Sequence, residues 1–184
     1  MWEGLIRHFP EREILCVDLP GFGQSAARRD ISIKGMARVV LEVVDALAWE
    51  SLLCFGHSMG GYVALALAEQ RPDLLRGLSL LHSHPYADTE EKKTARNRSL
   101  EFLRNNGVKP YVRQLIPTLF APEFARARRP LVEELLQQAE SYPAEGIAAA
   151  LQAMRDRPDC SGLLEALQVP VLFLIGTEDA AIPE

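Results

Sequence analysis

Residues 56–61 read Gly-His-Ser-Met-Gly-Gly and directly follow the apolar run Leu-Leu-Cys-Phe at residues 52–55. A Gly-x-Ser-x-Gly sequence between a buried strand and a helix is typical of a nucleophile elbow, a sharp turn that lifts a serine hydroxyl clear of a sheet. Side chains two residues either side of the serine would collide across such a turn, so we expect both Gly56 and Gly60 to be required by space. The alternative interpretation is an ordinary glycine-rich turn.

The segment after the elbow supports the first interpretation. Residues 62–70 are rich in alanine and leucine and predict a helix whose N-terminus points at Ser58. That arrangement places the backbone N–H of Met59 and the positive end of the helix beside the serine. Both would stabilise an oxyanion that develops during attack by the serine hydroxyl.

Composition limits the classes of protein to consider. The chain has 184 residues, 48% of them hydrophobic, which predicts one domain, with room for an insertion, and an ordinary core. Its net charge of −5 gives no electrostatic reason to expect nucleic acid or a membrane surface as a partner. There is no apolar run of 18 residues and no secretory pattern. Three cysteines without a Cys-x-x-Cys spacing fit a cytoplasmic protein, and we expect Cys16 and Cys54 to be small core residues.

Apolar strand-length runs alternate with helical patterns along the chain. In order, the sequence predicts a helix at residues 1–10, a strand at 13–18, a loop at 19–25, a helix from Ile33 with Ser32 as its N-cap, a strand at 51–56, the elbow and its helix ending at Arg71, a strand at 78–82, a helix at 163–167 and a strand at 169–176. Strands that are apolar along their length predict a parallel sheet covered on both faces, and therefore an α/β fold.

Residues 88–157 differ from the rest of the chain. They are rich in Glu, Lys, Arg, Gln and Ala, are interrupted by five prolines, and contain no strand-like run. We expect several short helices inserted into the α/β core, which divides the chain into core (1–87), inserted helices (88–157) and core (158–184). The basic cluster Arg126, Arg128 and Arg129 is interpreted as a solvated helix face rather than an anion site.

A serine nucleophile needs a base, usually histidine, oriented by a carboxylate. Asp179 follows the last apolar strand, at the edge where parallel sheets place functional groups, and is our candidate for the acid. The alternative interpretation is a turn-forming aspartate. Glu178 is the lesser candidate for the acid.

No histidine follows Asp179, although elbow hydrolases place theirs there. His8 is expected at the surface, and the turn sends the side chain of His57 away from the serine hydroxyl. His82 and His84 follow a strand end and face the same sheet edge as Ser58. We expect them to line the substrate pocket or hold the inserted helices, and each is only a secondary candidate for the base. The triad is thus incomplete, and we expect no measurable esterase turnover from these 184 residues.

Three motifs in the right order and spacing closely resemble the α/β-hydrolase superfamily, in its capped esterase, lactonase and carbon–carbon hydrolase branch. They are Asp-Leu-Pro-Gly-Phe-Gly-Gln-Ser at residues 18–25, the elbow at 56–61, and the strand and acid at 169–179. The resemblance implies that Ser58 is the nucleophile, that Met59 supplies one oxyanion N–H, and that Asp179 is the acid. It also implies that residues 88–157 form a cap over the substrate pocket.

The sequence departs from the family in two places. It contains no counterpart of the family's third strand with its His-Gly loop, which gives the second oxyanion N–H, and none of the last strand, the triad histidine and the final helix. We therefore expect an internal stretch of a longer hydrolase. The missing third strand would lie between the strands at 13–18 and 52–55, so its absence would open the sheet and leave the segment marginally stable.

The resemblance implies hydrolysis of a small carboxylic ester, lactone, thioester or carbon–carbon bond, without cofactor or metal. A serine at the elbow argues against the epoxide hydrolases and haloalkane dehalogenases of the same fold, which use a carboxylate there. Two alternatives stay open: a non-catalytic binding protein that has lost its base, and a cofactor-free haloperoxidase-like activity. The partner expected is a small-molecule substrate, with no nucleic acid and no membrane.

Overall fold

The fold is built around a three-stranded parallel sheet in a computed structural model that describes residues 2–26, 28, 32–179 and 182. The strand order is β1-β2-β3, with β1 at Leu52–His57, β2 at Leu75–Leu81 and β3 at Val171–Leu174. His57 lies opposite Leu81, and Leu81 lies opposite Leu174, so all three strands end at one edge. The predicted parallel α/β architecture is confirmed.

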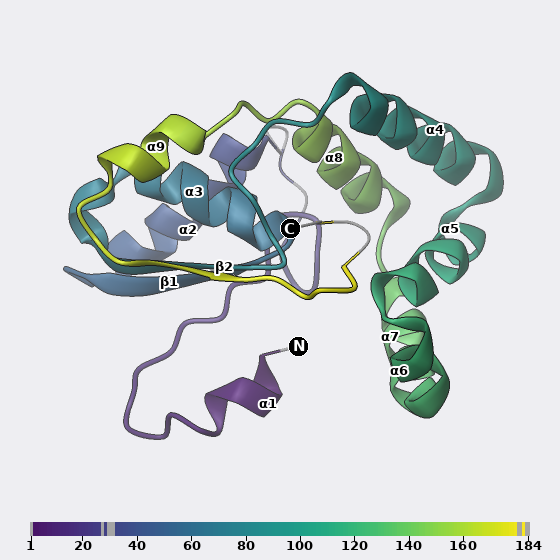
Figure 1. Ribbon diagram of the computed structural model, residues 1–184, viewed down its shortest axis with the longest axis horizontal. Coiled ribbons are helices and arrows are strands. Elements are labelled where there is room, and N and C mark those ends of the chain that lie inside the picture. Colours follow the sequence, from purple (N-terminus) through teal and green to yellow (C-terminus); the bar gives the residue numbers. More distant parts are fainter. Residues whose placement is uncertain (1, 27, 29–31, 180–181, 183–184) are drawn as a thin grey trace.

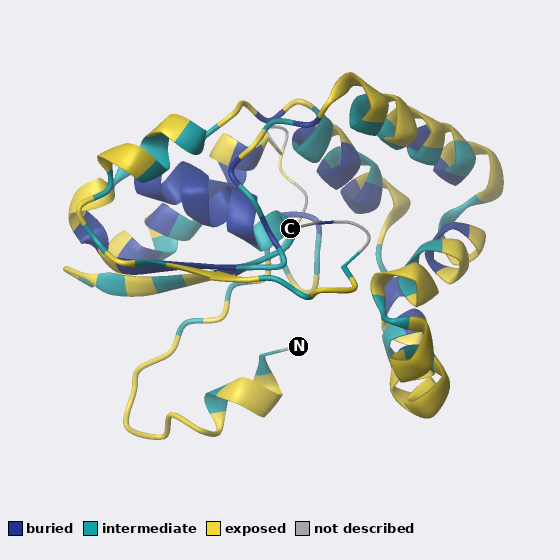
Figure 2. Cartoon of the chain, viewed as in Figure 1, coloured by how far each residue is buried: buried dark blue, intermediate teal, exposed yellow. Residues whose placement is uncertain are grey.

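Three helices cover one face of this sheet (Figure 1): α2 (Ile33–Ala46), α3 (Met59–Gln70) and α9 (Ser161–Ala166). Helix α3 is buried along its length because it lies between the sheet and α2, as the dark ribbon in Figure 2 shows. Helix α2 starts where the sequence predicted, and the backbone N–H of Gly35 donates to Ser32 Oγ at 3.0 Å. A short 3-10 turn, η1 (Pro72–Leu74), leads from α3 into β2.

The opposite face of the sheet is open among the described residues. Leu53 is 64% exposed and Phe55 51%, and Leu172 and Leu174 are each 52% exposed. Register places these side chains on the same face, away from α3. The expectation that helices cover both faces is therefore wrong for the part of the chain that the structure describes.

The strand expected at residues 13–18 does not form. This segment is irregular, Ile14 is 43% exposed, and Cys16 is exposed rather than in the core. A strand needs a hydrogen-bonded neighbour, and β1 pairs only with β2 among the described residues. The helix expected at residues 1–10 is a single turn, α1 (Glu3–Ile6). By contrast, Cys54 lies inside the fold as expected, and burial raises the pKa of its thiol to about 11.

The segment after β2 consists of helices, as predicted, and packs around its own apolar cluster, which includes Leu103, Tyr111, Leu136 and Leu151. The helices stand beyond the end of the sheet in Figure 1. Arg126, Arg128 and Arg129 are exposed, which fits a solvated face. The elements are α4 (Glu90–Asn106), α5 (Val108–Leu115), η2 (Ile116–Leu119), α6 (Pro122–Ala127), α7 (Arg129–Glu140) and α8 (Ala144–Arg155).

The loop at residues 18–25 locks this helical segment against the core. A Cβ on Gly146 in α8 would lie 2.3 Å from the carbonyl oxygen of Gly21, so the two backbones approach closely only because residue 146 is glycine. Phe22 meets Tyr142 edge-on, with ring centroids 5.5 Å apart. The loop therefore fixes where α8 begins relative to the sheet.

Candidate active site

Ser58 stands at a strained turn between β1 and α3. Its backbone has φ 51° and ψ −119°, a conformation that costs a residue with a side chain about 1–3 kcal/mol. Three hydrogen bonds hold it. Its N–H donates to the carbonyl of Leu81 at 2.9 Å, while its own carbonyl accepts from the N–H of Gly61 at 2.9 Å and the hydroxyl of Ser83 at 3.0 Å. The turn is thus fixed by the end of the neighbouring strand, as a nucleophile elbow requires.

The glycines of the elbow are not equally constrained. A Cβ on Gly56 would lie 2.4 Å from the carbonyl oxygen of Gly60, and one on Gly61 would lie 2.3 Å from Ser83 Oγ. A Cβ on Gly60 would meet nothing within 4 Å. The expectation that Gly60 is required by space is therefore wrong: the helix leaves the turn so that Gly61, one residue later, faces the residues after β2.

The N-terminus of α3 offers a donor beside the serine. Met59 is the first residue of this 12-residue helix, and its N–H has no hydrogen-bond acceptor among the described residues. The Ser58 hydroxyl likewise makes no hydrogen bond within the described part of the chain. A serine hydroxyl and a backbone N–H therefore stand next to each other, each without a hydrogen-bond partner among the described residues.

Asp179 is paired with a histidine that precedes it by 97 residues. His82 Nδ1 lies 2.6 Å from Asp179 Oδ2, and the N–H of Ile182 donates to Asp179 Oδ1 at 2.9 Å. The backbone N–H of His82 donates to the carbonyl of Leu174 at 2.8 Å, which ties the end of β2 to the end of β3. Glu178 is exposed and takes no part in this pairing.

Sequence reasoning treated His82 mainly as a pocket residue and did not identify the partnership with Asp179. The signal for it was present: His82 follows β2 and Asp179 comes shortly after β3, and these strands are neighbours in a parallel sheet. His82 also adopts φ +46°, a left-handed backbone that turns the chain at the end of β2. With the backbone turned in this way, the His82 ring lies against the loop that carries Asp179.

His57 completes the polar group at this edge. Its ring centroid lies 5.6 Å from that of His82, in an edge-on arrangement. Burial lowers the pKa of His57, and the neighbouring His82 lowers it further. Asp179 acts in the opposite direction and raises this pKa, but its effect is smaller. His57 is therefore neutral near pH 7.

His84 belongs to a different environment. Its ring lies 5.6 Å from that of Tyr62 and 5.7 Å from that of Tyr86, and its Nδ1 is buried without a hydrogen-bond partner among the described residues. Burial and the nearby Arg157 lower the pKa of His84. His84 follows the same strand as His82 but packs on aromatic side chains instead of a carboxylate.

A second polar cluster joins the two ends of the helical segment. Asp88 accepts hydrogen bonds from Arg157 Nη1 at 2.7 Å and from Arg96 Nε. Burial alone would raise the pKa of Asp88, but the hydrogen bonds from Arg96 and Arg157 outweigh it and hold the pKa below the ordinary 3.8. Arg157 also donates to the carbonyls of Met154 and Tyr86. Asp88 and Arg157 are the residues at which the sequence predicted that this segment begins and ends, but their pairing was not predicted.

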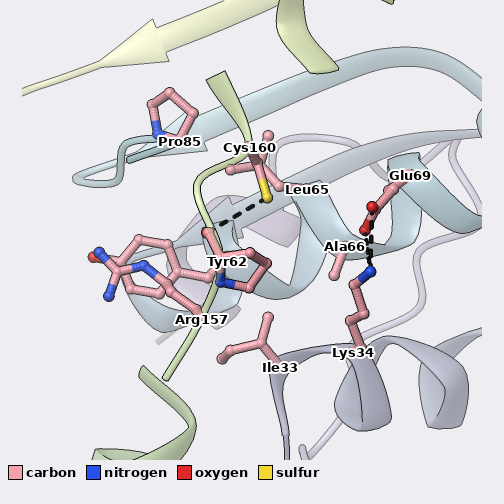
Figure 3. Close-up of a pocket in the computed structure, with 10 residues that line it drawn as sticks. Ile33, Lys34, Tyr62, Leu65, Ala66, Glu69, Pro85, Arg157 and Cys160 are labelled. Carbon is pink, nitrogen blue, oxygen red and sulfur yellow. Dashed lines mark hydrogen bonds and ion pairs between the residues drawn. The ribbon is translucent and has the colours of Figure 1, made fainter. Parts of the chain in front are cut away.

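A small cavity of about 10 Å³ lies beside this second cluster (Figure 3). The guanidinium of Arg157 lies 3.8 Å from the centroid of the Tyr62 ring, and both residues line the cavity. Lys34 and Glu69, which form an ion pair, also line it. This volume holds about one water molecule and is too small for an organic substrate. Ser58 does not line it. Within the described residues, no group of three or more His, Cys, Asp or Glu side chains is placed to hold a metal ion.

Comparison with known proteins gives a consistent result. The family model for the alpha/beta hydrolase fold matches residues 1–184. The chain is 26% identical over 180 residues to 3-oxoadipate enol-lactonase 1 of Acinetobacter baylyi, covering 97% of this chain and 66% of the lactonase. It is 29% identical over 189 residues to 2-succinyl-6-hydroxy-2,4-cyclohexadiene-1-carboxylate synthase of Citrobacter koseri, covering 97% of this chain and 72% of the synthase.

Solved structures agree with these matches. A thermophilic esterase from Thermogutta terrifontis is 35% identical with a TM-score of 0.83, covering 90% of this chain and 61% of the esterase. The enol-lactonase of Burkholderia xenovorans has a TM-score of 0.85 at 21% identity, covering 96% of this chain and 67% of that one, which shows a shared fold. The chain thus spans about two thirds of the length of these relatives. With a family match along its entire length, it belongs to the alpha/beta hydrolase fold family.

Proposed function

We propose that this protein is a serine hydrolase in which Ser58 is the nucleophile, Asp179 the acid and the Met59 N–H an oxyanion donor. The observation that carries the proposal is the strained backbone of Ser58, held between β1 and α3 with its hydroxyl unoccupied beside an unoccupied helix N–H. Strain of this kind persists where the surrounding structure fixes it, and it is concentrated at sites of chemistry. Attack by Ser58 on a carbonyl would place the resulting oxyanion at the start of α3.

The proposed substrate is a small carboxylic ester or lactone, with thioesters and activated carbon–carbon bonds in the same chemical class. Relatives named as an esterase and enol-lactonases support this class. Residues 88–157 would form the cap, and His57, His82 and His84 would line the pocket beneath it. The reaction needs no cofactor or metal. We further propose that the protein acts in the cytoplasm, without nucleic acid or membrane partners. As a separate finding, none of the described helices combines the length and the apolar composition of a membrane span.

The alternative function is a binding protein that retains the pocket but no longer turns over substrate. The observation that favours it is the absence of a hydrogen bond between the Ser58 hydroxyl and any histidine within the described residues. Under this alternative, Ser58→Ala would leave ligand affinity unchanged and there would be no hydrolysis to lose.

The two functions are separated by hydrolysis of p-nitrophenyl acetate and butyrate and of a small γ-lactone. The assay compares the protein as its gene encodes it with the Ser58→Ala variant. We expect ester or lactone hydrolysis that Ser58→Ala abolishes. Hydrolysis that persists in Ser58→Ala, or none in either protein, would contradict the proposed function. The Gly60→Ala variant is a suitable control because a Cβ at that position would have no neighbour within 4 Å apart from the adjacent residues and the backbone of its own helix.

A further inference from the structure

We infer that Ser83 positions the proposed oxyanion donor of this site: its buried hydroxyl holds the peptide that joins Ser58 to Met59 and thereby directs the Met59 N–H. The inference rests on the proposed function, in which Ser58 is the nucleophile and Met59 supplies that N–H. It gives a role to a residue that the sequence did not single out. Ser83 acts through the backbone and needs no contact with the substrate.

The Ser58 carbonyl and the Met59 N–H belong to one peptide unit. Such a unit is planar, and there is no cis peptide bond among the described residues, so its C=O and its N–H point in opposite directions. The carbonyl accepts from the hydroxyl of Ser83 at 3.0 Å and from the N–H of Gly61 at 2.9 Å. A carbonyl oxygen has two lone pairs, and these two donors use both. The groups that fix the carbonyl therefore also fix the direction of the N–H.

This peptide needs a support because the backbone of Ser58 is strained. Ser58 has φ 51° and ψ −119°, whereas a residue with a side chain at such a φ ordinarily has a ψ of about +47°. Rotation of ψ towards the ordinary value would turn the peptide over and carry the Met59 N–H away from its place. The carbonyl would also leave its two donors. The hydrogen bond from Ser83 opposes this rotation.

Ser83 is suited to this role by its place in the fold. Its side chain is fully buried, and its hydroxyl must be the donor, since a carbonyl can only accept. Gly61 belongs to the same turn as Ser58, but Ser83 comes from the end of the neighbouring strand β2. The residue before it, His82, is tied to β3 by the hydrogen bond from its N–H to the carbonyl of Leu174. Ser83 is thus a support from outside the elbow.

The approach of Ser83 to the elbow depends on Gly61. A Cβ on Gly61 would lie 2.3 Å from Ser83 Oγ and 2.5 Å from Ser83 Cβ, so a glycine lets the serine side chain lie against the first turn of α3. The Ser83 hydroxyl has no other hydrogen-bond partner among the described residues. Its one polar interaction in this part of the chain is therefore with the peptide that follows Ser58.

A fixed N–H matters most when negative charge develops. Attack by Ser58 would turn the carbonyl oxygen of the substrate into an oxyanion, and a donor that is already aimed at this oxygen stabilises it without reorganisation. The hydrogen bond to the Ser58 carbonyl also polarises the peptide, which makes the Met59 N–H a stronger donor. Both effects are larger in the transition state than in the bound substrate. Loss of the Ser83 hydroxyl should therefore lower kcat and leave KM unchanged.

The test compares Ser83→Ala with Ser79→Ala in the protein as its gene encodes it. Ser79 is the matched control because it is also a buried serine, on β2, and makes no hydrogen bond to the elbow among the described residues. Hydrolysis of p-nitrophenyl butyrate gives kcat and KM, and labelling to completion with a fluorophosphonate counts the working sites. We expect Ser83→Ala to lower kcat per working site by roughly 10-fold at unchanged KM, less than the loss of an entire oxyanion donor costs. Ser79→Ala should keep both constants.

Two further measurements separate the hydrogen bond from the shape of the side chain. Butylboronic acid bonds to a serine oxygen and forms a tetrahedral adduct with an oxygen in the place of the oxyanion. Its inhibition constant should rise in Ser83→Ala by the same factor as kcat falls, roughly 10-fold. Ser83→Cys keeps a side chain of similar size but offers only a weak S–H donor, so it should also lower kcat.

The outcomes separate the inference from the proposed function. A fall in kcat at unchanged KM, with a matching rise in the inhibition constant, supports the inference. Unchanged kcat in Ser83→Ala, or full activity in Ser83→Cys, overturns it and leaves the proposed function standing. A rise in KM alone, a loss of working sites alone or an equal loss in Ser79→Ala also overturns it, because Ser83 would then serve only the pocket or the fold. An absence of Ser58-dependent turnover in the unsubstituted protein ends both.

Discussion

The two polar clusters of this protein differ in how they use their polar groups. At the sheet edge, the His82 side chain is 42% exposed and that of Asp179 14%, and within the described residues both His82 Nε2 and the Ser58 hydroxyl are unoccupied. At the base of the helical segment, the Asp88 side chain is fully buried and that of Arg157 is 3% exposed. There, both Asp88 oxygens and both terminal guanidinium nitrogens of Arg157 make hydrogen bonds.

This difference indicates that the first cluster is suited to chemistry and that the second stabilises the fold. A partly exposed cluster that holds its members in place but leaves reactive atoms unoccupied is suited to a substrate. A buried cluster whose opposite charges pair with one another holds segments of the fold together. Removing one member of such a cluster leaves an unpaired buried charge. Substitutions in the first cluster should therefore change rates, and substitutions in the second should change the free energy of unfolding.

The largest expected effect comes from Asp179, the proposed acid. We expect Asp179→Asn to lower turnover by roughly 10⁴-fold while leaving the melting temperature nearly unchanged, because an amide neither fixes the tautomer of a histidine nor stabilises its cation. The matched control is Glu178→Gln, an exposed neighbour with no role in the pairing, which should be nearly silent. Steady-state hydrolysis of p-nitrophenyl butyrate measures both. The reverse pattern would move the acid to Glu178.

Substitutions in the second cluster should change the free energy of unfolding. We expect Asp88→Asn to lower the free energy of unfolding by about 3–5 kcal/mol, because Arg157 and Arg96 lose the charge that compensates them. Glu42→Gln is the control: Glu42 pairs with Arg28 at 3.0 Å, but the two side chains are 60% and 53% exposed, so its loss should cost less than about 1 kcal/mol. Urea unfolding monitored by circular dichroism compares them. Equal losses would show that burial does not distinguish the two pairs.

The elbow glycines sharpen the account of the first cluster. Gly61→Ala should destabilise the protein by about 1–3 kcal/mol, because its methyl group would meet Ser83, which holds the backbone of Ser58. Gly60→Ala should be neutral or stabilise by up to about 1 kcal/mol, because alanine is the better helix former and the space is open. Thermal unfolding of the two variants gives the comparison. A greater loss from Gly60→Ala would mean that the helix leaves the turn differently.

The smallest expected effect is on how the stability of the protein depends on pH. The pKa of Asp88 is held below 3.8 in the folded protein, against about 3.9 for an unperturbed aspartate, so its contribution to stability is present above about pH 4 and is lost as the pH falls through the lower folded value. The stability difference between the unsubstituted protein and Asp88→Asn should therefore narrow as the pH is lowered from 6 to 3. Urea midpoints across this range measure it. A difference that stays constant would show that the charge of Asp88 is not what stabilises the cluster.

Local signals in the sequence predicted much of this structure. The elbow, the helix α3 and the strand before Asp179 follow from glycine spacing and apolar runs, which act within a few residues. The strand expected at residues 13–18 failed because strand formation depends on a neighbour, and an apolar run does not say whether one is present. The sequence also predicted that Gly60 is required by space, whereas the structure requires a glycine at position 61. Which of the two positions is crowded depends on the direction in which α3 leaves the turn.

The pairing of His82 with Asp179 depends on strand order, which joins residues 97 positions apart. Chain order alone placed the expected base after the acid, so sequence reasoning gave His82 a lesser role. The same limit applies to Asp88 and Arg157, whose contact forms only when the helical segment closes on itself. What could not be predicted was therefore the set of contacts made across the fold.

The central claim is that Ser58 is a nucleophile, and covalent labelling tests it most directly. The protein as its gene encodes it would be treated with a fluorophosphonate, digested, and mapped by mass spectrometry. We predict a single phosphonylated residue, Ser58, with labelling lost in Ser58→Ala. Labelling at another residue, or no labelling under conditions that modify a known serine esterase, would contradict the account.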